Sequence, residues 1–201
     1  WLATLDLSLH LCRPLSRGHV VARGSVLRAG RQTIVLEVAL ADDAGTEAGM
    51  ATMTYAILPR RADTPVHARD FSAPRTEFGG PGSGLAAPFA DSLGIRVVDA
   101  AAGRAEIEMS DYVRNSLSAL QGGAAATLVD VASVAFGREL LGTPVATTDL
   151  EIHYLALGKL APIHARARLL RRDDRSAALR VEVRESGPDA RLCYVATTRV
   201  G

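Results

Sequence analysis

The chain has 201 residues, of which 48% are hydrophobic and 22% charged, proportions that are ordinary for a globular protein with a sizeable core. A formal net charge of +1 favours neither nucleic acid nor a membrane surface as the main partner. No stretch reaches the ~18 consecutive apolar residues that span a bilayer, since Asp130 interrupts the best candidate, 124–136. The chain opens on a strand-like pattern and not on a secretory signal, so we expect a cytoplasmic protein.

The cysteine and lysine content gives expectations about disulfides, metal binding and the source genome. Cys12 and Cys193 are too few and too far apart for a disulfide framework or a zinc site, so we expect two buried free thiols and no metal. Lys159 is the only lysine, and this bias toward arginine, with abundant alanine, is typical of a GC-rich bacterial genome.

The first sixty residues have the alternating pattern of antiparallel strands. Apolar side chains recur at every second position through 34–40, and Asp42-Asp43-Ala44-Gly45 supplies a turn after them. This alternation places one face of each strand against a core and the other in water. We predict strands at residues 3–12, 19–29, 32–41 and 48–58.

Residues 60–84 differ in composition from what precedes them. They are rich in Pro, Arg and Gly and end in Gly79-Gly80-Pro81-Gly82-Ser83-Gly84. Because such a segment can bury little apolar surface, it predicts a mobile linker.

The chain after the linker predicts one long helix among further strands. Residues 121–141 are apolar nearly all round, so we expect this helix to be enclosed on most sides. The other expected elements are a short helix at 88–93, a hairpin at 95–98 and 104–109, and strands at 145–156, 162–172, 175–185 and 190–200. This order predicts an α+β fold of the hotdog type, in which a curved antiparallel sheet wraps a long central helix.

The two sets of four strands repeat one another at a separation of 143 residues. Ala3–Leu11 matches Ala146–Tyr154, and scattered identities continue to Met53-Thr54, which correspond to Ala196-Thr197 after a slip in the preceding turn. A register kept over ~50 residues predicts a tandem duplication.

The duplication divides the chain into a partial first repeat (1–59), the linker (60–84) and a complete second repeat (85–201). The first repeat has strands only, and four strands without a helix would leave an apolar face in water. We therefore expect the first repeat to be incomplete at its N-terminus, with its opening hairpin and helix upstream of Trp1. The alternative is that another chain covers this sheet.

Two glycines, Gly122 and Gly123, open the long helix. The first amides of a helix have no partner within it, and glycine lets a ligand approach the backbone closely. Such a turn can hold the negative oxygen that develops on a thioester carbonyl under attack. The alternative is that the glycines only permit tight entry into a crowded core.

Asp130 lies inside the same helix, where an unpaired carboxylate costs several kcal/mol unless its pKa rises. It is either a structural residue bonded to nearby backbone or a general base or nucleophile that faces a pocket. Thr127 and Ser133 lie three residues to either side of it. Because Asp130 lies roughly 10 Å along the helix from Gly123, the two cannot act on one carbonyl. If both act, the aspartate of one repeat meets the glycine turn of another.

The spacing of these residues resembles a known family. Asn115, five residues, Gln121, the two glycines and Asp130 are similar to the pattern of hotdog-fold acyl-CoA thioesterases of the phenylacetate-degradation type, and 146–154 also looks like theirs. The resemblance implies hydrolysis of acyl-CoA thioesters without a metal or redox cofactor. The family usually has histidine where Gln121 stands, and Gln cannot titrate.

The resemblance also implies a role for each matched residue. Asp130 activates water or attacks directly, the Gly122 amide polarises the carbonyl, and Asn115 helps to hold substrate or water. Thr147 assists the aspartate. Gln121, Gly123 and Thr4, the counterpart of Thr147, contact substrate. The expected partner is acyl-CoA, with no nucleic acid, no membrane span and a homodimer of double-hotdog chains.

Other polar residues carry less weight. His10 and His153 occupy equivalent positions on the strand face of Asp6 and Asp149, where a solvated role outweighs a metal or acid–base role. The scattered arginines, among them Arg166, Arg168, Arg171 and Arg172, suit either CoA phosphates or an exposed sheet edge.

Two other functions remain to be compared with hydrolysis. Hydratase chemistry on this fold needs a histidine on the helix, and none occurs between His67 and His153. The alternative function is a non-catalytic acyl-CoA-binding or scaffold protein with decayed sites.

Overall fold

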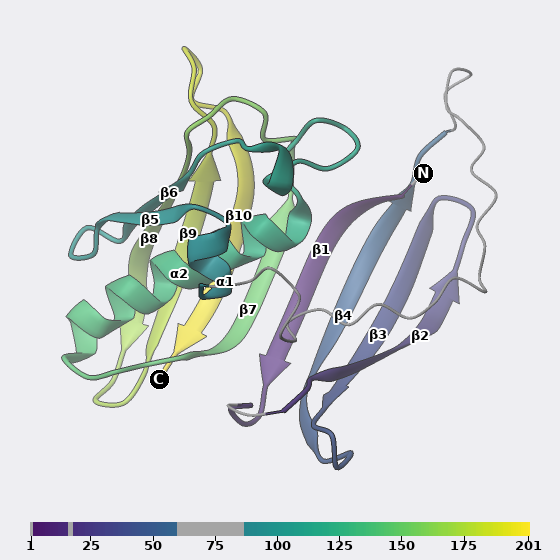
Figure 1. The fold of residues 1–201 in the computed structure, drawn as a ribbon, viewed down its shortest axis with the longest axis horizontal. Coiled ribbons are helices and arrows are strands. Elements are labelled where there is room, and N and C mark those ends of the chain that lie inside the picture. The colour runs from purple at the N-terminus through teal and green to yellow at the C-terminus, as the bar shows by residue number, and fades with distance from the viewer. Residues whose placement is uncertain (1, 16–17, 60–86) are drawn as a thin grey trace.

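The computed structural model describes residues 2–15, 18–59 and 87–201, which form one antiparallel ten-stranded sheet with a long helix across half of it (Figure 1). The strands are β1 (Leu2–Leu11), β2 (Val21–Ala29), β3 (Thr33–Ala41), β4 (Glu47–Ile57), β5 (Ile95–Asp99), β6 (Arg104–Ile107), β7 (Thr147–Tyr154), β8 (Ile163–Arg172), β9 (Ala177–Arg184) and β10 (Leu192–Val200). The helices are α1 (Phe89–Ser92), the 3-10 turn η1 (Asp111–Val113) and α2 (Gly122–Leu141).

The predicted elements are confirmed in kind and order. All eight strands expected around the repeat are present, the hairpin is β5–β6, and the long helix is α2. The turn of the hairpin requires Gly103, whose φ is +64° and whose Cβ would lie 2.6 Å from the Ala167 carbonyl oxygen. The predicted linker at 60–84 lies outside the described residues.

The sheet order is β2-β3-β4-β1-β7-β10-β9-β8-β6-β5, so the first four strands mirror the next four about the β1–β7 pair. Three β-bulges also recur in equivalent places. The extra residues are Leu5 and Thr148, Leu27 and Leu170, and Ala48 and Cys193. The two halves of the sheet therefore share their order and their irregularities.

One part of the predicted correspondence is wrong. The register pairs Ala51 with Leu9 and Val38, and it pairs Ala196 with Ile152 and Val181. Ala51-Thr52, and not Met53-Thr54, is therefore the counterpart of Ala196-Thr197. The cause is the turn between β9 and β10 (185–191), which is two residues longer than the turn between β3 and β4 (42–46).

The pair β1–β7 forms a seam between the two halves. Ser8 lies opposite Glu151, and on either side Asp6 pairs with His153 and His10 with Asp149. The 143-residue separation relates Ser8 to Glu151, and it converts the Asp6–His153 pair into the Asp149–His10 pair, as in an interface with two-fold symmetry.

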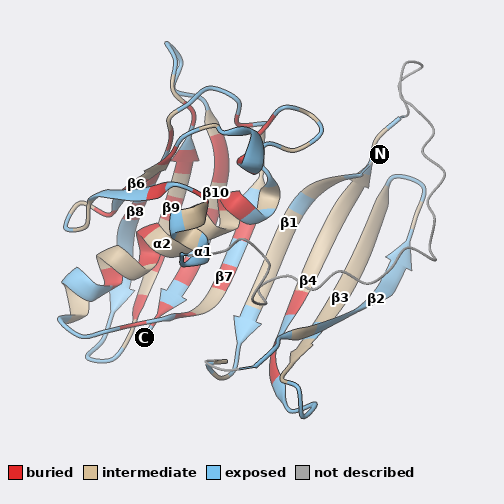
Figure 2. Ribbon diagram, viewed as in Figure 1, coloured by how far each residue is buried: buried red, intermediate tan, exposed pale blue. Residues whose placement is uncertain are grey.

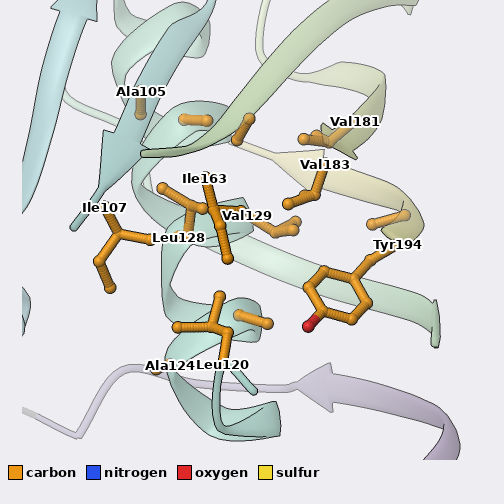
Figure 3. Packing of buried hydrophobic residues seen from close by; sticks show 14 of the residues in the cluster. Ala105, Ile107, Leu120, Ala124, Leu128, Val129, Ile163, Val181, Val183 and Tyr194 are labelled. Carbon is orange, nitrogen blue, oxygen red and sulfur yellow. The ribbon is translucent and has the colours of Figure 1, made fainter. Parts of the chain in front are cut away.

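The buried core lies between α2 and its half of the sheet (Figure 2). In Figure 3, Leu128 and Val129 of the helix lie against Ile163, Val181 and Val183 of the sheet. Helix and sheet approach closely at Gly137, where a Cβ would lie 2.5 Å from Val200 Cγ2. The helix ends at Gly142, which is left-handed with φ +67°.

The half-sheet β1–β4 carries no helix among the residues that the structure describes, and Figure 2 shows it mostly intermediate or exposed. Exposed apolar side chains of this half include Leu2, Leu5, Leu11, Met50 and Ile57.

Two burial expectations need correction. The helix is buried on its sheet side only, while Val131, Val134 and Phe136 stay partly exposed, so it is not enclosed on most sides within the described chain. Cys12 is exposed because it follows the last residue of β1, whereas Cys193 is buried as expected. In the described ranges no helix is long and apolar enough to cross a membrane.

Candidate active site

The N-terminus of α2 presents two unpaired amides. Gln121 is the N-cap, and its Oε1 accepts a hydrogen bond of 2.9 Å from the Ala124 amide. Within the described residues, the amides of Gly122 and Gly123 donate to no acceptor. These donors lie at the positive end of the helix dipole and are free to bind a negative oxygen. The predicted donor turn therefore has the geometry that its sequence implies, with Gln121 engaged as its cap.

A tyrosine that the sequence pattern did not single out holds this turn. Tyr154 donates a hydrogen bond of 2.8 Å from its hydroxyl to the Gly122 carbonyl oxygen. Burial raises the pKa of Tyr154 above its usual range, so the phenol stays protonated and remains a donor. A signal was available, because alternation from the buried Leu150 and Ile152 places Tyr154 on the helix-facing side of β7.

A cavity of about 360 Å³ opens beside the turn and spans the seam. From the first half of the chain it is lined by Leu2, Ala3, Thr4 and Leu5. From the second half it is lined by Asn115, Ser116, Leu117, Leu120, Gln121, Gly122, Tyr154, Leu155, Ala156, Leu157 and Tyr194. Four predicted site residues, Thr4, Asn115, Gln121 and Gly122, thus meet in one place. None of the lining residues is a carboxylate or a histidine.

Asn115 has a structural task in the loop before the helix. Its Oδ1 accepts hydrogen bonds from the amides of Leu117 (2.8 Å) and Ala119 (3.1 Å). Its own amide donates to the Ala119 carbonyl oxygen at 2.8 Å. The side-chain nitrogen forms no hydrogen bond to any described residue, so it is the part of Asn115 that can contact a ligand.

Asp130 is bonded to a side chain of the sheet and not to backbone. Its Oδ1 accepts a hydrogen bond of 2.5 Å from the Thr147 hydroxyl at the start of β7. Burial raises the pKa of Asp130 above its usual range, and the bond from Thr147 opposes that shift. The neighbouring hydroxyls do not bond to Asp130. Thr127 donates to the Gly123 carbonyl oxygen and Ser133 to that of Val129.

The predicted residues therefore form two groups. Asp130 lies eight residues after Gly122, which is roughly 12 Å along the helix. One group is the donor turn with Thr4, and the other is the acid with Thr147. Neither group contains both a carboxylate and a free helix N-terminus.

The remaining polar candidates lie outside both groups. His10 Nδ1 is 2.8 Å from Asp149 Oδ1, and both side chains are about half exposed, so this pair is a solvated contact across the seam. In the ranges that the structure describes, no cluster of His, Cys, Asp and Glu could hold a metal ion. Arg166, Arg168, Arg171 and Arg172 are all exposed.

Solved structures share this architecture at low sequence identity. A hot dog fold protein of unknown function from Alicyclobacillus acidocaldarius is 18% identical over 98% of this chain and 77% of its own, with a TM-score of 0.61. An acyl-ACP thioesterase from Bacteroides thetaiotaomicron is 13% identical over 100% and 76%, also with a TM-score of 0.61. A thioesterase from Staphylococcus aureus is 16% identical over 55% and 94%, with a TM-score of 0.51. These likenesses identify the hotdog fold.

No curated protein matches the sequence. The family model of the thioesterase superfamily, however, matches residues 2–49 and 118–190, which together make up more than half of the chain. The expected recognition is confirmed at that level: the chain belongs to the hotdog-fold thioesterase superfamily.

Proposed function

We propose that the protein hydrolyses acyl-CoA or related acyl thioesters at sites that span the seam between two hotdog repeats. A tandem duplication is supported by the mirrored strand order, the three shared bulges and the symmetric β1–β7 register. The match of one family model to two separate segments agrees with it. The seam is then an internal counterpart of a two-fold dimer interface.

The observation that carries the proposal is the place of Thr4. Thr4 lines the cavity of the Gly122 turn, and its counterpart Thr147 holds Asp130. If the seam has two-fold symmetry, as we propose, we expect a carboxylate beside Thr4 and a donor turn beside Asp130. Each complete site combines the turn of one repeat with the threonine and acid of the other. The second acid and the second turn are not among the described residues.

The chemistry needs no metal or redox cofactor in this scheme. The aspartate removes a proton from water, and the water oxygen adds to the thioester carbon. The helix amides stabilise the oxyanion that forms, the C–S bond then breaks, and the thiolate takes up the proton. Alternatively the carboxylate attacks the carbon itself and water cleaves the resulting anhydride. Both routes yield a free acid and a thiol.

A second candidate is a non-catalytic protein that binds acyl thioesters. The absence of a carboxylate or histidine from the lining of the Gly122 cavity favours it. The two candidates can be separated directly, because binding of an acyl thioester without its hydrolysis is measurable.

Release of free thiol from a panel of acyl-CoAs tests the proposal on the full-length chain. We expect Asp130→Asn to lower kcat by about 100-fold or more, the usual contribution of a general base. The matched control is Asp149→Asn. Asp149 is a half-exposed aspartate bonded to His10, and it belongs neither to the donor turn nor to the Asp130–Thr147 pair. Tight acyl-CoA binding without thiol release by the unmutated protein would identify the binding protein instead. Equal loss in both variants would refute a specific role for Asp130.

A further inference from the structure

We propose that Tyr154 is a positioning residue for the donor turn, because its hydroxyl fixes the peptide unit between Gly122 and Gly123. The inference rests on the proposed function, since it assigns the Gly123 amide as the donor that this tyrosine aims at the substrate carbonyl. Tyr154 lines the same cavity and donates to the Gly122 carbonyl oxygen at 2.8 Å.

The two glycines explain why the donor turn needs a side chain that fixes its backbone, a role that we call the clamp. A glycine in a helix costs about 1 kcal/mol relative to alanine because it loses more backbone freedom. Two in succession at a helix start leave the first turn loosely determined. The hydrogen bond that Gln121 Oε1 accepts restrains the Ala124 amide, which follows the free amides of Gly122 and Gly123 in the chain and does not fix them.

The carbonyl that Tyr154 binds and the amide of Gly123 belong to one planar peptide unit. In a trans peptide the C=O and N–H bonds point in opposite directions, so a bond that fixes the oxygen also fixes the direction of the hydrogen. A hydrogen bond to the oxygen polarises the unit and strengthens the donor at its other end. The Gly122 amide belongs to the preceding unit, whose oxygen accepts from Ala125 at 3.0 Å and not from Tyr154.

The tyrosine is itself held in place. Its ring meets that of Tyr194 edge to face at 5.3 Å and 67°. Tyr194 accepts a hydrogen bond of 3.3 Å from the Gly158 amide, and the Gly158 carbonyl accepts one of 2.8 Å from Leu120. Leu120 directly precedes the cap residue. These contacts therefore link the turn, both tyrosines and Gly158, which directly follows the 155–157 wall of the cavity.

The hydroxyl can be removed without losing the ring. The Tyr154 ring lies 3.6 Å from the position of a Gly122 Cβ, in ordinary van der Waals contact, and phenylalanine keeps that packing. The equivalent position in the first half of the chain is Leu11, which has no hydroxyl. Among the described residues, this hydroxyl contact therefore belongs to the Gly122 turn and has no equivalent at Leu11.

The first test is the kinetics of Tyr154→Phe. We expect kcat to fall about 10-fold, less than the 10²–10³ that follows loss of a whole oxyanion donor, while KM changes less than about twofold. Fluorotyrosine at position 154, which retains the donor, restores kcat. The matched control is Tyr112→Phe, since Tyr112 is 62% exposed and outside the cavity. Unchanged kcat in Tyr154→Phe, or an equal fall in the control, overturns the inference.

The second test works without turnover. A ketone analogue, in which a methylene replaces the thioester sulfur and the carbonyl carries carbon-13, reports donor strength through its infrared stretching frequency. We expect a shift to lower frequency on binding to the unmutated chain and a smaller shift in Tyr154→Phe. If the analogue shows this difference but no thioester is cleaved, the positioning role stands and the proposed function fails. Equal shifts in both proteins overturn the positioning role even where thioesters are cleaved.

Discussion

The Thr147 hydroxyl donates a hydrogen bond of 2.5 Å to Asp130, and this contact joins the middle of α2 to the first residue of β7. This hydrogen bond gives one carboxylate oxygen a partner, on a helix whose other residues are mostly apolar. Burial and this bond act on the pKa in opposite directions, and burial has the larger effect. Burial therefore raises the pKa of Asp130 above the usual aspartate range, and the Thr147 hydroxyl limits that rise.

The pH dependence of turnover should report this balance. The reaction needs ionised Asp130, so kcat should fall with decreasing pH along a limb that lies above the usual aspartate range. Thr147→Val removes the bond that favours the carboxylate, so the limb should move to still higher pH. The pH profile of kcat for both proteins measures the shift. Identical limbs would show that another group controls the rate.

The same titration predicts a difference in stability. Because the folded-state pKa of Asp130 is above its unfolded value, its stabilising contribution is present below the ordinary value of 3.8 and is lost as pH rises through the folded pKa. Asp130→Asn cannot ionise, so it should gain stability relative to the unmutated chain as pH rises from below 3.8 to neutral. Urea unfolding across this range checks the sign. A constant difference at all pH values would contradict it.

Two substitutions of Gln121 should separate its effect on stability from its effect on activity. Gln121→Ala removes the cap on the Ala124 amide and should cost about 1 kcal/mol of unfolding free energy. Gln121→Glu keeps an acceptor there but adds a negative charge beside the free amides, so it should preserve the melting temperature and lower kcat. Glu139→Ala, at an exposed position near the other end of α2, is the control. Equal activity of Gln121→Glu would exclude an oxyanion at this turn.

Hydrophobic periodicity was sufficient to predict the elements and the placement of the acid. The strands around residues 34–40 and 179–183 alternate with a period of two, and a long apolar run bounded by Gln121 and Gly142 admits only a helix. The family resemblance implied that Thr147 assists Asp130, and the structure shows a hydrogen bond between the two side chains. These features depend on local sequence or on a matched motif.

The features that were missed depend on where distant segments meet. Tyr154 becomes a clamp only because β7 passes under the first turn of α2, and Asn115 becomes a loop residue only because 115–119 folds back on it. In the sequence, a chance similarity of Met53-Thr54 to Ala196-Thr197 hides the two extra residues between β9 and β10. Strand pairing resolves such a shift because each residue has partners on both sides.

The close approach of α2 to β10 gives a prediction that is independent of catalysis. A Cβ at Gly137 would lie 2.5 Å from Val200 Cγ2 and 3.2 Å from Val145 Cγ2, in a fully buried contact. Gly137→Ala should therefore destabilise the fold by about 1–3 kcal/mol, although alanine favours a helix. Adding Val200→Ala makes room for the methyl group, so the double variant should lose less than the two single losses combined. Thermal unfolding of the four proteins measures this coupling, and strictly additive losses would mean that the helix shifts away from the sheet to accommodate the alanine.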